Sequence, residues 1–304
     1  MITNSDPLSP TASSIRIVLH PSDFSEASLV AFAHALKAAL ISKSKLVLIH
    51  VSDEDETSRT EFPAVRETLE RWKLLPPGSP RSAVTELGID VAKVIGHGSD
   101  PVKGVLGYIE QYGADLIVLA THHHGLDWLH KSISEPVARK SREMTLFVPT
   151  GSGGFVSLTD GSVSLRNVLI PIAAIPQPQP AIAGAARLIQ QLKCESGKIT
   201  LLHVGDNGSI PAVVTPEVPG WTWHKMTKQG NVIEVILEAA RQADADLILM
   251  TTDSRNGFLD ALRGSHSERV LERTWNETIL HGEAPVSAHF VTVDRILTQL
   301  FLDA

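Results

Sequence analysis

Two halves of this 304-residue sequence repeat the same short blocks in the same order. Residues 114–121, ADLIVLAT, return at 245–252 as ADLILMTT. Two earlier blocks, RIVLHP and LIHVSD, return as RNVLIP and LLHVGD; they occupy 16–21 and 48–53 in the first half, and 166–171 and 201–206 in the second. Such spaced self-similarity is the signature of a duplicated structural unit.

Each half alternates short apolar runs with stretches of helical spacing. The apolar runs predict strands at 15–19, 45–51, 91–96, 115–120 and 145–149, then at 167–171, 198–204, 221–227, 246–251 and 286–293. Helices are expected at 25–39, 62–75, from Asp100-Pro101 onward, and at 132–141, 180–193, 230–242 and 265–279. Because strands that alternate with helices form parallel sheets, the pattern predicts an α/β fold with two tandem doubly wound parallel five-stranded sheets.

The same pattern predicts the domain boundaries. Residues 1–14 are expected to form a flexible tail before a first domain at 15–150. Residues 151–164 are rich in Gly, Ser and Thr, which is typical of a linker, and a second domain follows at 165–304. The stretch Pro211 to Pro219 stands where the first half has a helix, and it is either a lid or a surface loop.

Composition excludes several classes of function. The net charge of −7 and an aromatic share of 5% argue against binding to nucleic acid or to an anionic membrane surface. No apolar run reaches the length of a membrane span, and the first residues do not resemble a secretory signal. Cys194 is the single cysteine, so the reducing cytoplasm is the simplest compartment.

The candidate site residues follow the predicted strands, because open α/β sheets bind ligands at the carboxyl ends of their strands. Asp23 follows the first strand, where it could contact a ribose or base, or order the turn and cap the next helix. His122 to His124 precede Ser132, and a loop followed by a helix start can hold a phosphate. Together with His20 and His50 at neighbouring strand ends, the three histidines could also suit Zn²⁺ or Ni²⁺, although a polar loop is the simpler interpretation and no metal is firmly implied. No catalytic motif is present.

With these blocks, the chain resembles the universal stress protein family in tandem form. The resemblance rests on HPSDFSEAS at 20–28, on the two ADLI blocks, and on the helix starts KSISEPVA at 131–138 and GSHSERVL at 264–271. It implies a doubly wound domain of the adenine nucleotide α hydrolase-like, Rossmann-like type. It also implies pairing through antiparallel fifth strands, here between the two halves as an internal pseudo-dimer, with a further homodimer as an additional expectation.

The ATP-binding members of this family carry an acidic residue after strand one and the loop pattern G-x-x-G, nine residues, G-[S/T]. In the first half, Asp23 matches the acid, and Ala120, His123 and Lys131 stand at the glycine positions. In the second half the spacing is kept, but Ala173 replaces the acid. The resemblance places adenine at Val51 and implies an ATP or AMP site formed from Pro21, Ser22, Asp23, Val51, Ala120, His122, His123, Lys131, Ser132, Ile133, Thr252, Gly264 and Ser265.

The expected function is a regulatory or protective role in the stress response, without dedicated catalysis, with an adenine nucleotide in the first domain. Two alternatives remain open. The first is a nucleotide-free scaffold that binds a partner protein or another small ligand. The second is a weak ATPase.

Overall fold

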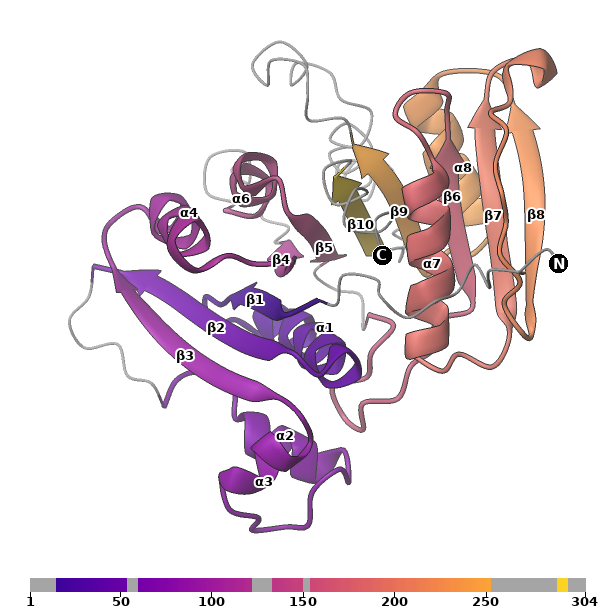
Figure 1. Cartoon of the computed structure of the whole chain (residues 1–304). Coiled ribbons are helices and arrows are strands. Elements are labelled where there is room, and N and C mark those ends of the chain that lie inside the picture. The colour runs from indigo at the N-terminus through magenta and orange to yellow at the C-terminus, as the bar shows by residue number, and fades with distance from the viewer. Residues whose placement is uncertain (1–14, 54–59, 122–132, 150–153, 253–288, 295–304) are drawn as a thin grey trace, which may run out of the picture.

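The computed structural model describes residues 15–53, 60–121, 133–149, 154–252 and 289–294. The strands within these residues form one ten-stranded sheet (Figure 1). The strand order is β3-β2-β1-β4-β5-β10-β9-β6-β7-β8, so the second half repeats the order of the first in reverse. The strands of the first half are β1 (Ile17–Pro21), β2 (Lys45–Ser52), β3 (Asp90–His97), β4 (Leu116–Thr121) and β5 (Met144–Pro149). Those of the second are β6 (Asn167–Ile172), β7 (Gly197–Val204), β8 (Trp221–Lys228), β9 (Leu247–Thr252) and β10 (His289–Asp294).

The two halves join at their last strands. Within each half all paired strands are parallel, whereas β5 and β10 pair antiparallel, with Phe147 opposite Phe290 and Thr145 opposite Thr292. The join lies between the halves in Figure 1. The structure therefore confirms two doubly wound five-stranded units paired within one chain.

Helices cover both faces of this sheet. One face packs against α1 (Glu26–Ser42), α2 (Val65–Arg71), α3 (Ser82–Glu86) and α7 (Gln179–Gln191), and the other against α4 (Pro101–Tyr112), α6 (Ser134–Ser141) and α8 (Val232–Gln242). Successive strand residues point to opposite faces, so Val18 joins the first core and Leu19 the second, and both are fully buried. Burial on both faces explains why the strands are nearly continuous apolar runs.

The repeated Ala-Asp pair has the same structural role in each half. One carboxylate oxygen of Asp115 accepts hydrogen bonds from the backbone N–H groups of Arg16 and Ile17, at 2.9 and 2.8 Å. The carboxylate of Asp246 does the same for Arg166 and Asn167, both at 2.8 Å. Each aspartate thus ties the start of strand four to the start of strand one. These carboxylates lie at the amino ends of the strands, away from the predicted site.

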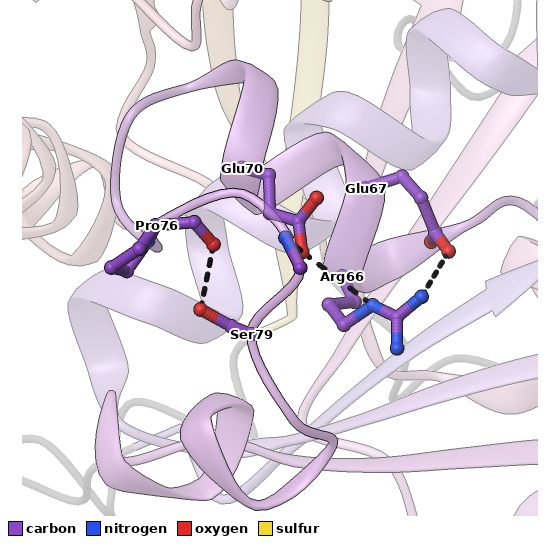
Figure 2. A network of polar contacts seen from close by, with 6 residues as sticks. Arg66, Glu67, Glu70, Pro76 and Ser79 are labelled. Carbon is purple, nitrogen blue, oxygen red and sulfur yellow. Dashed lines mark hydrogen bonds and ion pairs between the residues drawn. The ribbon is translucent and has the colours of Figure 1, made fainter.

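The segment between β2 and β3 is specific to the first half. It contains α2 and α3, and Figure 2 shows the polar contacts that close the turn between them. Glu70 pairs with Arg66 at 3.6 Å and accepts a hydrogen bond from the Gly78 N–H at 3.0 Å. The Ser79 hydroxyl donates to the Pro76 carbonyl at 2.6 Å. The corresponding stretch of the second half, residues 205–220, contains only the short 3-10 turn Asn207–Ser209.

The described part of the expected linker, residues 154–164, is a folded loop packed on the first half. Its ends meet through an antiparallel bridge between Val156 and Val163. The Lys37 ammonium of α1 donates to the Gly161 carbonyl at 2.7 Å, and the Trp72 indole N–H donates to the Leu158 carbonyl at 3.1 Å. A composition rich in Gly and Ser therefore serves here to make tight turns against two helices.

Several predicted elements differ from the structure in extent. The helix expected at 62–75 covers only Val65–Arg71, because Pro63 disfavours a helical Phe62 and Lys73 has a positive φ of 58°. The short helix α3 was not expected. The last strand is His289–Asp294, against the expected 286–293, and residues 286–288 lie outside the described residues. The tail at 1–14, the linker residues 151–153 and the helix expected at 265–279 also lie outside them.

Candidate functional site

A cavity of about 250 Å³ opens at the carboxyl ends of β1, β2 and β4. In the strand order, β1 and β4 are neighbours from which the chain winds in opposite directions, and this switch point is where doubly wound sheets bind ligands. Its lining residues are Pro21, Ser22, Asp23, Ser28, Ile49, His50, Val51, Pro101, Val105, Leu119, Ala120, Ile133 and Ser134. The cavity therefore combines an apolar wall with a polar turn.

The apolar wall depends on a close approach between β2 and α4. Val51 is buried at the end of β2, and a side chain at Gly104 would come within 2.6 Å of the Val51 methyl groups. Glycine at this position lets α4 approach the sheet, so that Pro101 and Val105 face the same cavity as Val51. An apolar group of a ligand suits this wall.

The polar turn follows β1. Asp23 accepts hydrogen bonds from the N–H and the hydroxyl of Ser25, at 3.1 and 2.7 Å. Ser25 in turn caps α1, because its hydroxyl accepts from the Ser28 N–H at 3.2 Å. The turn-ordering role expected for Asp23 is thus present, and its carboxylate also lines the cavity.

Phe24, in the same turn, has a left-handed backbone conformation with φ of 65°. Its ring stacks on His50 with centroids 4.2 Å apart, and meets Phe62 edge-on at 5.2 Å. The imidazole Nδ1 of His50 lies 2.7 Å from the Ser22 carbonyl. Because a bulky residue at positive φ is strained, these contacts are what hold the turn in shape beside the cavity.

A buried histidine supports the turn from the core. His20 is fully buried, with Nδ1 2.9 Å from the Val118 carbonyl and Nε2 3.2 Å from the Ser28 hydroxyl. The Ser28 hydroxyl lies 3.0 Å from that of Ser22, at the cavity surface. Burial lowers the pKa of His20 from 6.5 to about 4, an effect only partly offset by its bond to the Val118 carbonyl.

Two helices begin at the edge of the cavity. Asp100 caps α4 by accepting from the Lys103 N–H at 3.1 Å, which confirms the predicted helix start, and Pro101 occupies the first turn. At the start of α6, the Ser134 hydroxyl donates to the Ala120 carbonyl at 2.7 Å. This bond fixes the beginning of α6 against the end of β4, so the helix N-terminus faces the cavity wall that contains Ile133.

The structure brings six of the predicted site residues together at this cavity: Pro21, Ser22, Asp23, Val51, Ala120 and Ile133. Thr252 ends β9 in the other half, and His122, His123, Lys131, Ser132, Gly264 and Ser265 lie outside the described residues. The prediction missed Ser28, Ile49, His50, Pro101, Val105, Leu119 and Ser134. Of these, Ile49, His50 and Leu119 could have been found from their place at the ends of the same strands.

The corresponding edge of the second half is built differently. His203 is the counterpart of His50, and its Nδ1 lies 3.2 Å from the Ile172 carbonyl. Its Nε2 lies 2.9 Å from the Ser209 hydroxyl, so the turn at 207–209 sits against it. Farther along, the side-chain amide of Gln179 donates to the Val214 carbonyl at 2.8 Å and accepts from the Val214 N–H at 3.0 Å. The stretch from Pro211 to Pro219 is therefore a loop anchored to α7.

Comparison with known proteins identifies the family. The model of the universal stress protein family matches residues 14–149 and 218–279. The chain belongs to the universal stress protein family. This membership supports a role in the stress response. A comparison with curated proteins finds no match for the chain.

Solved structures show the same fold over nearly the whole chain. A universal stress protein from Archaeoglobus fulgidus is 17% identical with a TM-score of 0.56, and the match covers 92% of this chain and 96% of that one. A protein of unknown function from Pseudomonas aeruginosa PAO1 is 13% identical with a TM-score of 0.59, over 94% of this chain and 96% of that one. Both likenesses support the tandem arrangement described above.

In the part of the chain that the structure describes, no group of three or more His, Cys, Asp or Glu side chains could hold a metal ion. Residues His122 to His124 lie outside that part. No described helix is both long and apolar enough to cross a membrane.

Proposed function

We propose that this universal stress protein acts in the cytoplasm as a regulatory or protective protein that binds an adenine nucleotide, ATP or AMP, in the cavity of its first half. The observation that carries the proposal is the meeting of three features at one switch point. These are the apolar wall at Val51, the acceptor groups of Ser22 and Asp23, and the start of α6 at Ser134. Together they suit a base, a ribose and a phosphate.

The size of the cavity favours a position for each part of the nucleotide. A volume of about 250 Å³ is below the range of roughly 300–1,000 Å³ typical of pockets that enclose a whole drug-sized ligand. The nucleoside would therefore fill the cavity, with the base against Val51 and Val105 and a ribose hydroxyl donating to the Asp23 carboxylate. The phosphates would extend past the start of α6, where partial positive charge favours anions.

Calorimetric titration of ATP, ADP, AMP and adenosine into nucleotide-stripped protein tests the proposal. We expect all four to bind, and Asp23→Ala to weaken adenosine about tenfold or more, because a hydrogen bond to a charged group contributes about 1.5–3 kcal/mol. The matched control is Asp206→Ala, which removes an aspartate that follows β7 at the same edge of the second half. The Asp206→Ala variant should bind adenosine with the same affinity as the wild type.

Three outcomes would change the proposal. If none of the four ligands gives heat or a thermal shift at millimolar concentration, the nucleotide assignment is wrong and a scaffold that binds a partner protein replaces it. If Asp206→Ala weakens binding and Asp23→Ala does not, the site lies in the second half. If the bound ATP is hydrolysed steadily and Asp23→Ala abolishes the phosphate release, the protein is a weak ATPase.

A further inference from the structure

A continuous chain of hydrogen bonds runs from the core to the cavity wall. It begins at the Val118 carbonyl in β4, passes through the ring of His20 and the hydroxyl of Ser28, and ends at the hydroxyl of Ser22. The successive heavy-atom distances are 2.9, 3.2 and 3.0 Å. His20, Ser28 and Ser22 are each at most 6% exposed, and the two serines line the cavity.

The chemistry of the groups fixes the direction of every bond in this chain. A carbonyl oxygen only accepts, so the proton of the His20 ring lies on Nδ1. Burial in the core keeps the ring neutral near pH 7, since the pKa of His20 falls to about 4. A neutral ring with its proton on Nδ1 has a bare Nε2, which accepts from Ser28. The Ser28 proton is then in use, and Ser22 must donate its own proton to Ser28.

Ser22 lines the cavity, and its hydroxyl can therefore offer only lone pairs to a ligand there. Of its two acceptor positions, one receives the Phe24 N–H at 3.3 Å, which leaves capacity for one more hydrogen bond. A ligand atom that reaches Ser22 must bring a proton of its own. A ligand atom that can only accept would meet a lone pair and would lose hydration without gaining a bond.

We propose that Ser22 is a specificity-determining residue that accepts a hydrogen bond from the ligand and cannot donate one, and that His20 imposes this direction through Ser28. The ligand class that follows is one with a hydroxyl or amine donor beside the base, which in a nucleotide is a ribose hydroxyl; this assignment of the ligand rests on the proposed nucleotide site. The Asp23 carboxylate next to Ser22 is likewise an acceptor, so a vicinal diol can satisfy both.

The direction of the chain is tested directly by nuclear magnetic resonance of the free protein. Long-range ¹H–¹⁵N correlation of the histidine rings at pH 7, with His20 assigned by comparison with His20→Asn, reports which nitrogen carries the proton. We expect the Nδ1–H tautomer. A proton on Nε2, or a doubly protonated ring, reverses or breaks the chain and overturns the inference whether or not a nucleotide binds.

The consequence for specificity is tested with adenosine analogues modified at the 2′ or 3′ position. Deoxy and fluoro analogues cannot donate from that position, whereas amino analogues can. At one of the two positions we expect the deoxy and fluoro forms to bind about tenfold more weakly than adenosine, and the amino form to bind like adenosine. This loss corresponds to one hydrogen bond of ordinary strength together with an unpaired acceptor.

Two variants separate this role from a merely structural one. In Ser22→Ala, adenosine should lose about tenfold in affinity and the analogues should become equal. In Ser28→Ala, Ser22 is free to turn its proton toward the cavity, so the fluoro analogue should regain affinity relative to adenosine. Ser42→Ala is the control, because Ser42 lies on α1 with its hydroxyl bonded to the Ala38 carbonyl, away from the cavity.

The outcomes distinguish this inference from the proposed function. If adenosine binds and all analogues bind equally well to the wild type, the specificity role of Ser22 is wrong while the nucleotide site stands. If adenosine does not bind at all, the nucleotide assignment fails, and the tautomer of His20 alone then decides whether Ser22 is an obligate acceptor.

Discussion

Replacing Phe24 by glycine should leave a more stable protein than replacing it by alanine. Phe24 has φ of 65°, a conformation that costs an L-residue about 1–2 kcal/mol and glycine almost nothing. Both substitutions remove the ring and its contacts with His50 and Phe62, so this loss cancels in the comparison. Glycine gives back about 0.4–1 kcal/mol through the greater entropy of its unfolded chain. The free energy of unfolding should therefore favour Phe24→Gly over Phe24→Ala by about 0.5–1 kcal/mol.

Urea denaturation of the two variants at the same temperature measures this difference. The control is the pair Glu110→Gly and Glu110→Ala at an exposed position of α4, where alanine should be the more stable by about 1 kcal/mol. The two pairs thus have opposite signs. If Phe24→Ala is as stable as Phe24→Gly, or more so, the turn beside the cavity stores no backbone strain and the reasoning is wrong.

Three further predictions follow from the described contacts. Asp115→Asn and Asp246→Asn should each lower the free energy of unfolding by about 1.5–3 kcal/mol and by similar amounts, because each carboxylate accepts two backbone N–H groups; thermal denaturation checks this, and a loss in only one variant would contradict the shared role. Between about pH 6.5 and pH 4, His20 binds a proton in the unfolded chain but stays neutral in the folded protein, because its pKa is lowered to about 4. Lowering the pH over this range should therefore reduce the free energy of unfolding by up to about 3 kcal/mol. The His20→Asn variant should lack this part of the pH dependence of the melting temperature. Gly161→Ala should lower the melting temperature more than Gly78→Ala, since both glycines have positive φ but only at Gly161 would the new methyl group strike a ring, that of Trp72; equal losses would show that the loop does not pack there.

The sequence predicts the strands well and the polar turn only partly. A strand buried on both faces must be an apolar run, which is why β1, β2 and β4 are visible from residue types alone. Asp23 could be placed at the site because it follows such a run, whereas Val51, inside the predicted second strand, was placed there only by the family resemblance. Helix α3 is too short for a periodic pattern, and Pro63 shortens α2 although the apolar spacing continues around it.

The role of His20 could not be predicted from spacing. It stands one residue before the predicted Pro21, at a strand end, where the sequence suggested an imidazole for a metal and not a link in a hydrogen-bonded chain. Its function depends on Val118, which is 98 positions away in the sequence, and on the helical turn that brings Ser28 back over the strand. Contacts of this kind are set by tertiary packing, and local patterns do not encode them.

The antiparallel join between β5 and β10 has a consequence for how the protein is made. The open edge of β5, residues Met144–Pro149, is apolar, and its partner strand leaves the ribosome only after the rest of the second half has been synthesised. An unpaired apolar edge is a template for any compatible strand. On a polysome, the compatible strand closest at hand is the same segment of a neighbouring nascent chain. During translation of the second half, pairing of β5 with β10 of the same chain therefore competes with pairing of β5 segments between two neighbouring nascent chains.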